Sequence, residues 1–283
     1  MCRYRVVVWS ILASVFAWTG EASAGWIVEQ VVKGSGEDGR QQVLLQANRM
    51  KTVIHGEEEK PVMAFILDLN ANTITQVDYK KRYYSTATVQ EFGQMMQRMQ
   101  QATSDQMAQA MKEMQKTLKD MPPEQRKVME EMMRSHMPQA GPTPQNCVEP
   151  KVEHRKTGEE ATIAGYPAVR YDILIDGKLD SEVWLAKGIT AWRELDPKKI
   201  ERFGAEMAKL SPRCGPAQGR QRLPGDDPAL KLAGEGYPVR TVHRGGGDIT
   251  VEVVKAESRT VPATEFQPPT GFAKKTFREM MGQ

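Results

Sequence analysis

The residues best suited to chemistry are methionines, and 11 of the chain's 17 lie between residues 95 and 137. Met129, Met133 and His136 are spaced i, i+4 and i+7, so one face of a helix would present all three side chains. Thioether sulfur is a soft ligand that suits Cu(I). The same spacing is also produced by a helix that packs on a core. A Met-rich copper-binding protein is therefore one interpretation, but we expect no resident metal or cofactor.

Catalytic motifs are missing from the sequence. It contains no HExxH, GxSxG, P-loop or CxxC pattern. The four histidines are scattered, and Asp68, Asp78 and Asp172 have no spacing that would bring their carboxylates together. We therefore predict that the protein is not an enzyme.

The first residues have the pattern of an export signal. Arg3 and Arg5 precede an apolar run of 13 residues, which suits a secretory signal and is short for a membrane span. Ala22-Ser23-Ala24 is a small-x-small cleavage pattern. We predict cleavage after Ala24, a periplasmic location, no transmembrane anchor after cleavage, and a single domain over residues 25–283.

Two cysteines, Cys147 and Cys214, remain after this cleavage, and each lies in a loop rich in proline and glycine. An oxidising compartment permits a disulfide between them. Two free thiols are the alternative, which the sequence does not exclude. The 39 basic and 36 acidic residues nearly balance, so net charge gives no reason to expect nucleic acid or an anionic membrane as a partner.

The elements that must position these residues are mainly strands. Apolar alternation and turn residues predict strands at 26–33, 40–47, 50–54, 62–69, 73–79, 151–157, 161–165, 166–176, 178–186, 237–244 and 248–256. The strand 62–69 is almost wholly apolar, so we expect both of its faces to be covered. Short connections favour antiparallel pairing.

Helices are predicted between and after these strands. A capping box at Thr88-x-x-Glu91 begins an inserted helical hairpin over residues 88–137, which Pro122-Pro123 divides. Asp196 caps a further helix with Pro197 at its first position. The predicted fold class is α+β. A curved antiparallel sheet, a half-open barrel of about nine to eleven strands, carries the Met-rich hairpin and the further helix on its concave face.

Four stretches resemble a known family: "TIAGYPAVRYDI", "DSEVWLAKG", "MPPEQRKVMEEMM" and "VPATEFQPPTGF". They are similar, in order and spacing, to the bacterial exported family called domain of unknown function 4412. The resemblance runs from about Gly25 to Phe272. The family in turn looks like the periplasmic lipoprotein carriers (LolA-like), which implies a half-open barrel with helices over an apolar cavity. Fold analogy of this kind does not fix function.

The methionine stripe suggests a role. Met107, Met111, Met114 and Leu118 follow helical spacing, and methionine adapts to surfaces that change shape. We predict a non-enzymatic protein that binds or carries a hydrophobic ligand, with a lipid or acyl chain or an envelope protein as partner. The predicted lining is Phe65, Leu67, Met107, Met111, Met114, Leu118, Met129, Met133 and Trp184. The alternative is a structural or interaction module whose hairpin packs permanently.

Overall fold

The computed structural model describes residues 24–34, 38–56, 58–95, 97–98, 109, 112–113, 150–210, 231–244 and 248–280. The predicted export signal up to residue 23 and both cysteines lie outside these residues. So does most of the predicted hairpin 88–137, including all of its candidate lining and copper-binding residues. In the described part of the chain, no helix has the length and apolar character needed to cross a membrane.

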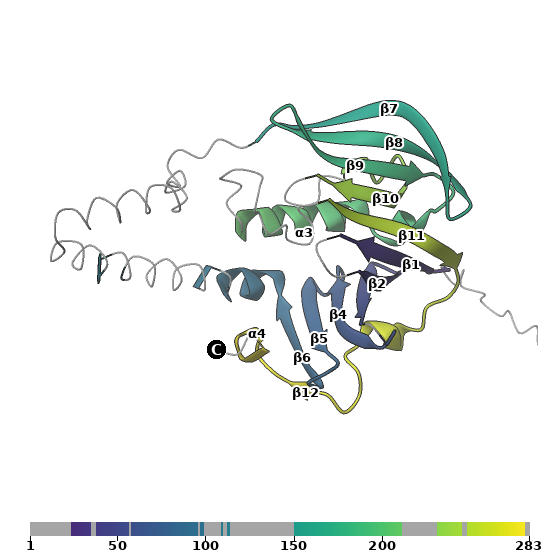
Figure 1. The fold of residues 1–283 in the computed structure, drawn as a ribbon. Helices are drawn as coiled ribbons and strands as arrows, with labels where there is room; N and C mark the ends of the chain where they lie inside the picture. The colour runs from purple at the N-terminus through teal and green to yellow at the C-terminus, as the bar shows by residue number, and fades with distance from the viewer. Residues whose placement is uncertain are drawn as a thin grey trace, which may run out of the picture.

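The strands form one open sheet of twelve, in the order β12-β6-β5-β4-β3-β2-β1-β11-β10-β9-β8-β7. All neighbours pair antiparallel except β12, which pairs parallel with β6. The bounds are β1 Trp26–Lys33, β2 Gly39–Gln46, β3 Arg49–His55, β4 Pro61–Asp68, β5 Thr73–Asp78, β6 Tyr83–Thr88, β7 Val152–Ile163, β8 Tyr166–Ile175, β9 Lys178–Ala186, β10 Tyr237–His243, β11 Ile249–Ser258 and β12 Ala273–Lys274. Figure 1 shows the sheet curving along this order.

The strand count corrects the prediction of nine to eleven. Strand β6 has the sequence YYSTAT, which lacks a clear apolar alternation, and two-residue β12 exists only because the chain returns to pair with β6. In contrast, the predicted strands 151–157 and 161–165 form the single strand β7. Its register against β8 shifts between Lys156 and Glu160, and Gly158-Glu159-Glu160 at this place are residues that sequence patterns do not assign to a strand.

Strand β1 lies in the middle of the sheet although it precedes every other strand in the sequence. It pairs with β2 on one side and with β11 on the other, so that Val28 faces Val43 and Ala256. This β1–β11 pairing, which we call the central seam, joins two meanders: β1 to β6, and β7 to β11. One sheet therefore unites the two strand-rich halves of the sequence.

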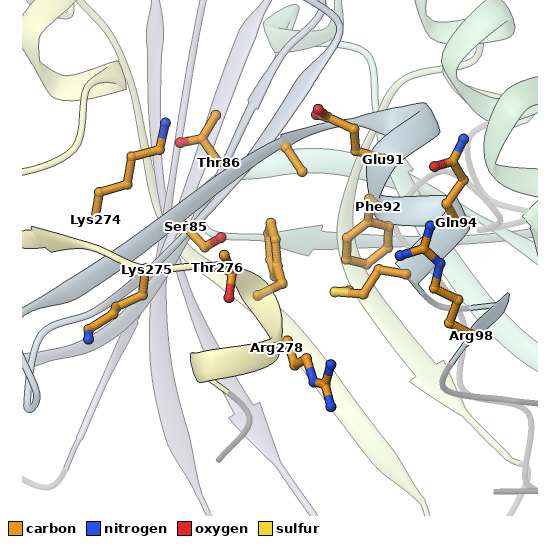
Figure 2. A pocket seen from close by; sticks show the side chains of 13 residues that line it. Ser85, Thr86, Glu91, Phe92, Gln94, Arg98, Lys274, Lys275, Thr276 and Arg278 are labelled. Carbon is orange, nitrogen blue, oxygen red and sulfur yellow. The ribbon is translucent and has the colours of Figure 1, made fainter. Parts of the chain in front are cut away.

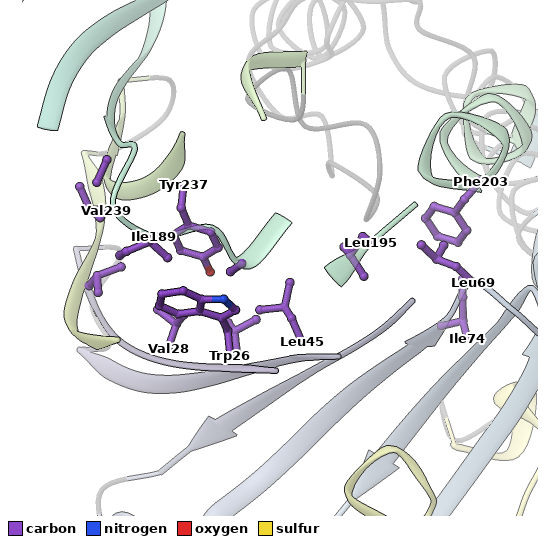
Figure 3. Close-up of a cluster of buried hydrophobic side chains, with 14 of the residues drawn as sticks. Trp26, Val28, Leu45, Leu69, Ile74, Ile189, Leu195, Phe203, Tyr237 and Val239 are labelled. Atoms are coloured by element: carbon purple, nitrogen blue, oxygen red, sulfur yellow. The ribbon is translucent and has the colours of Figure 1, made fainter. Parts of the chain in front are cut away.

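The larger core lies between one face of the sheet and the helix α3 (Pro197–Leu210), with the short 3-10 helix η2 (Ala191–Glu194) beside it. Figure 3 shows Phe203 of α3 over Leu69 and Ile74, and Trp26 and Leu45 rising from the sheet. Helix α3 begins as predicted, because the Lys198 amide donates to the Asp196 carboxylate at 2.9 Å.

A smaller core covers the opposite face. Ile27, Leu44 and Ile66 pack there with Phe266 of the 3-10 helix η4 (Ala263–Phe266), which belongs to the segment that leads to β12. The expectation that strand 62–69 is covered on both faces is wrong for Phe65, which remains 37% exposed. Side chains alternate along β4, so Phe65 points away from the core that buries Ala64 and Ile66.

Two short helical elements complete the described structure. One covers residues 89–95 and 97–98, and we call it the pocket helix. The other is α4 (Phe277–Met280), which follows closely after β12 and lies near β6 in Figure 1.

Candidate functional site

A pocket of about 610 Å³ lies where β6, the pocket helix and the C-terminal segment meet. Figure 2 shows its side chains converging from these three segments. The residues that line it are Ser85, Thr86, Ala87, Glu91, Phe92, Gln94, Met95, Arg98, Lys274, Lys275, Thr276, Phe277 and Arg278.

The same local motif begins both helical walls. Thr88 and Glu91 form the capping box predicted from the sequence, with the Glu91 carboxylate 2.8 Å from the Thr88 amide and the Glu91 amide 3.2 Å from the Thr88 hydroxyl. Thr276 and Glu279 form the same motif at α4, with the Glu279 carboxylate 2.7 Å from the Thr276 amide and the Glu279 amide 3.2 Å from the Thr276 hydroxyl. The backbone hydrogen bond from the threonine, reinforced by its hydroxyl, lowers the pKa of each glutamate. Both helices therefore start at fixed points beside the pocket.

Residues 274–278 form the C-terminal wall of the pocket, and two contacts join this wall to β6 and to the pocket helix. The Lys275 amide donates to the Tyr84 carbonyl at 2.8 Å, which extends the pairing of β12 with β6. The rings of Phe92 and Phe277 meet edge to face with centroids 5.4 Å apart, a favoured aromatic geometry. A segment distant in sequence thus becomes a structural wall of the pocket.

The inner surface is mainly apolar. Phe92, Met95 and Ala87 pack against the larger core from the pocket side, and Phe277 belongs to that core with only 7% of its surface exposed. An apolar ligand in this pocket would contact aromatic rings and a thioether, which adapts to irregular shapes.

The rim is basic. Arg98, Lys274, Lys275 and Arg278 line the pocket with Glu91 as the sole acidic residue of the lining. Glu91 accepts from Thr88 but keeps its negative charge, which also attracts Lys274. Lys275 lies 3.7 Å from Glu279 and over the Tyr83 ring at 5.4 Å. Within the described ranges, no carboxylate forms an ion pair with Arg98, Lys274 or Arg278. Four basic residues therefore face one acidic residue in the lining, and Glu91 and Glu279 offset only part of their positive charge.

A second polar cluster spans β7 to β10. The Asp172 carboxylate accepts from Arg155 at 2.8 Å and from Arg170 at 2.9 Å, and Glu182 accepts from Arg244 at 2.9 Å. Burial of Asp172 opposes its ionisation, but the two arginines outweigh this and lower its pKa. The acids and bases of this cluster satisfy one another, which is typical of a structural network.

One serine lies between an acid and a histidine. The Ser181 hydroxyl is 2.7 Å from the Asp180 carboxylate and 3.0 Å from Nδ1 of His243. A carboxylate only accepts, and a hydroxyl has one proton, so Ser181 donates to Asp180 and accepts from His243. A nucleophilic serine needs the opposite arrangement, in which the histidine accepts the hydroxyl proton. No group of three or more His, Cys, Asp or Glu able to hold a metal occurs in the described ranges.

Of the predicted lining residues, the structure describes Phe65, Leu67 and Trp184. Leu67 and Trp184 pack against the larger core from strands that are separated by β3, β2, β1, β11 and β10. Arg240 covers the Trp184 ring at 5.9 Å. None of the three lines the pocket. The predicted lining of methionines, Met107, Met111, Met114, Met129 and Met133 with Leu118, lies outside the described residues, as do His136 of the copper hypothesis and the Cys147–Cys214 pair.

Sequence reasoning missed the C-terminal wall. Residues 274–278 read Lys-Lys-Thr-Phe-Arg, and Thr276-x-x-Glu279 is a capping box that could have indicated α4. The three basic residues in this stretch, Lys274, Lys275 and Arg278, could have indicated a site for an anion. The sequence pattern does not, however, place this segment beside β6.

Comparison with solved structures finds distant similarity. An uncharacterized conserved protein from Thermus thermophilus is 9% identical with a TM-score of 0.43, over 90% of this chain and 91% of that one. A structure of PNGF-II is 8% identical with a TM-score of 0.39, and the match covers 92% of this chain and 32% of that one. A chain of the Pseudomonas aeruginosa MucA/MucB complex is 9% identical with a TM-score of 0.35, and the match covers 88% of this chain and 56% of that one. Similarity this low does not establish a shared function.

Comparison with curated protein sequences finds no match. A family model does match, over residues 86–272, a range that begins later than the predicted Gly25 and ends at the predicted Phe272. The matched range contains β7 to β11, the pocket helix and η4. It covers well over half of the chain, and the protein therefore belongs to the family described as Domain of unknown function (DUF4412).

Proposed function

We propose that this protein binds a hydrophobic ligand in the pocket between β6, the pocket helix and α4, and that it does not transform the ligand. The observation that carries the proposal is the apolar surface that Phe92, Met95 and Phe277 present to one pocket of about 610 Å³. Ligand pockets typically have volumes of about 300 to 1,000 Å³ with mainly apolar walls.

The size of the pocket suits an acyl chain or a similarly shaped apolar group. Each methylene moved from water into such a site contributes about 0.8 kcal/mol. A chain that buries roughly eight methylenes would thus gain about 6 kcal/mol before the entropic cost of binding. Association itself costs at least about 4 kcal/mol, so useful affinity requires a longer buried chain or further contacts.

The proposed location is the cell envelope. The sequence pattern over residues 1–24 supports export, and a protein that acts in the periplasm can bind lipids or lipid-linked molecules there. Export itself is tested by the N-terminal sequence of protein recovered from the periplasmic fraction, which should begin at Gly25.

The ligand proposal is tested by a charge placed on the apolar surface. Met95→Glu should weaken binding of a fluorescent long-chain fatty acid at least tenfold, because the carboxylate would be desolvated against the chain. Leu179→Glu is the matched control, since Leu179 is an exposed apolar residue of β9 outside the pocket. Affinity is measured by fluorescence titration, and circular dichroism checks that both variants remain folded.

Organic extraction of protein purified from its native envelope, followed by mass spectrometry, should also recover a lipid. If the unaltered protein neither retains a lipid nor binds any long-chain probe, the proposal is wrong. An interaction module would then be the better interpretation, and cross-linking in the envelope would detect its partner.

A further inference from the structure

The distribution of charge around the pocket differs from that of the chain as a whole. Acidic and basic residues are nearly equal in the sequence, 36 against 39, whereas the lining has four basic residues and one acidic residue. The excess lies on two separate segments, Arg98 on the pocket helix and the others on residues 274–278. In Figure 2, Arg98 lies on the side of Phe92 and Gln94, and Lys274, Lys275 and Arg278 extend from the C-terminal segment in different directions.

The neighbouring carboxylates, Glu91 and Glu279, are held in capping boxes and offset part of this positive charge. Glu91 accepts from Thr88 in one capping box, and Glu279 accepts from Thr276 in the other. Glu279 also lies 3.7 Å from Lys275. Arg98, Lys274 and Arg278 therefore lack a carboxylate in ion-pair contact among the described residues, and all three are exposed. Such a set of cations is available to an anion that enters from solvent.

The apolar surface and the basic rim belong to the same pocket. Phe92, Met95 and Phe277 form one side, and the cations stand at the solvent-exposed side. A ligand that satisfies both must be long and apolar at one end and negatively charged at the other. Arginine adds a planar fork that matches the two oxygens of a carboxylate or phosphate.

We infer that the pocket selects an amphiphile with an anionic head, a carboxylate or a phosphate monoester, whose chain lies against Phe92 and Phe277 and whose head lies among Arg98, Lys274 and Arg278. This inference rests on the proposed function and names its ligand class. The cations are exposed, so each contributes modestly and salt weakens its effect. The preference should therefore be clear at low ionic strength and reduced at high salt.

The test compares four ligands with the same sixteen-carbon chain: the carboxylate, the phosphate monoester, the alcohol and the amine. Each is titrated below its micelle concentration into the full-length protein. The two anionic ligands should bind at least tenfold more tightly than the alcohol, and the amine more weakly than the alcohol. Raising the salt from about 0.02 to 0.5 M should reduce the anionic preference severalfold.

The variant is Arg98→Glu with Lys274→Glu and Arg278→Glu. It should abolish or invert the anionic preference while alcohol binding changes less than threefold. The matched control is Lys80→Glu with Lys178→Glu and Lys187→Glu, which changes net charge equally at exposed positions outside the pocket. The control should keep the preference of the unaltered protein.

Each outcome separates the two proposals. If the alcohol binds as tightly as the anions, the proposed hydrophobic site stands and the head-group inference is overturned. If inorganic phosphate alone binds as tightly as the chain phosphate, the inference also fails, since the apolar surface then contributes nothing. If none of the four chains binds, the proposed function itself is wrong.

Discussion

Asp172 is a buried carboxylate whose charge is compensated by ion pairs. Its side chain is only 5% exposed, yet two arginines, Arg155 and Arg170, donate to it. Its removal would take a charged partner from both arginines, although Arg170 would keep Glu159 at 3.0 Å and Glu182 at 3.6 Å. Asp172 is therefore more important for stability than a surface carboxylate would be.

Asp172→Asn should lower the free energy of unfolding at pH 7 by roughly 1.5 to 3 kcal/mol, as expected for the loss of hydrogen bonds to a charged group. The pKa of Asp172 is lowered in the folded protein, so its ionised form stabilises the fold above the unfolded-state pKa. This contribution disappears as pH falls through the folded-state pKa. The difference between the variant and the unaltered protein should accordingly shrink below about pH 4.

Urea unfolding at a series of pH values provides the measurement. Glu58→Gln is the control, because Glu58 and its partner Lys60 are more than two-thirds exposed. Its effect should remain within about 1 kcal/mol, as for other surface pairs. A difference for Asp172→Asn that stays constant from pH 7 to pH 3 would contradict the assignment.

At the scale of elements, the two capping boxes determine where the walls of the pocket begin. The box at Thr276 is more critical, because α4 has only four residues and few hydrogen bonds of its own. Losing a threonine cap costs a helix about 1 kcal/mol. The loss should therefore affect the pocket more than the sheet.

Thr276→Ala should weaken ligand binding about three- to tenfold while lowering the melting temperature by only a few degrees. Thr276→Ser should restore most of the affinity, since a serine hydroxyl caps equally well. Titration of the fluorescent fatty acid and thermal unfolding measure both effects. Equal affinity in all three proteins would show that the start of α4 does not shape the pocket.

Elements with strong local signals were predictable. The capping box at Thr88 and the Asp196-Pro197 helix start are confirmed by hydrogen bonds. The Asp176-Gly177 turn is confirmed as well, since both residues adopt the left-handed conformation that a tight hairpin needs. These features depend on a few consecutive residues, so the sequence alone contains their cause.

Features that depend on distant pairing were not predictable. Strand β12 pairs with β6 through Ala273 and Lys274, and neither residue favours a strand. The pocket could not be predicted for the same reason, because the contact between Phe277 and Phe92 depends on the pairing of β12 with β6. The described pocket therefore lies among residues that local patterns did not connect, and the hydrophobic ligand stays a prediction.

At the scale of the whole molecule, the central seam makes the two meanders one structure. Val253 of β11 is 1% exposed and belongs to the larger core, whereas its neighbour Val254, the unpaired residue at the register shift against β1, is 49% exposed. A defect at Val253 should therefore weaken both meanders together, since each depends on the seam for its neighbour.

Val253→Ala should lower the free energy of unfolding by roughly 2 kcal/mol, as expected for a truncated core side chain. Val254→Ala, which makes the same chemical change at an exposed position, should cost less than about 0.5 kcal/mol. Hydrogen exchange followed by mass spectrometry should show equal loss of protection in β5 and β8 for Val253→Ala. Loss confined to β10 and β11 would argue against a single cooperative sheet.

The central seam also sets the order in which the protein can fold. Trp26 finds its partner Ser258 only after nearly the whole chain has been synthesised. Until then β1 has one edge without a neighbour, and an uncovered edge invites pairing with other chains. Contacts so distant in sequence slow folding. The earliest strand to be made thus waits for β11 before both of its edges are paired, and until then its exposed edge is where a chaperone would protect the nascent protein.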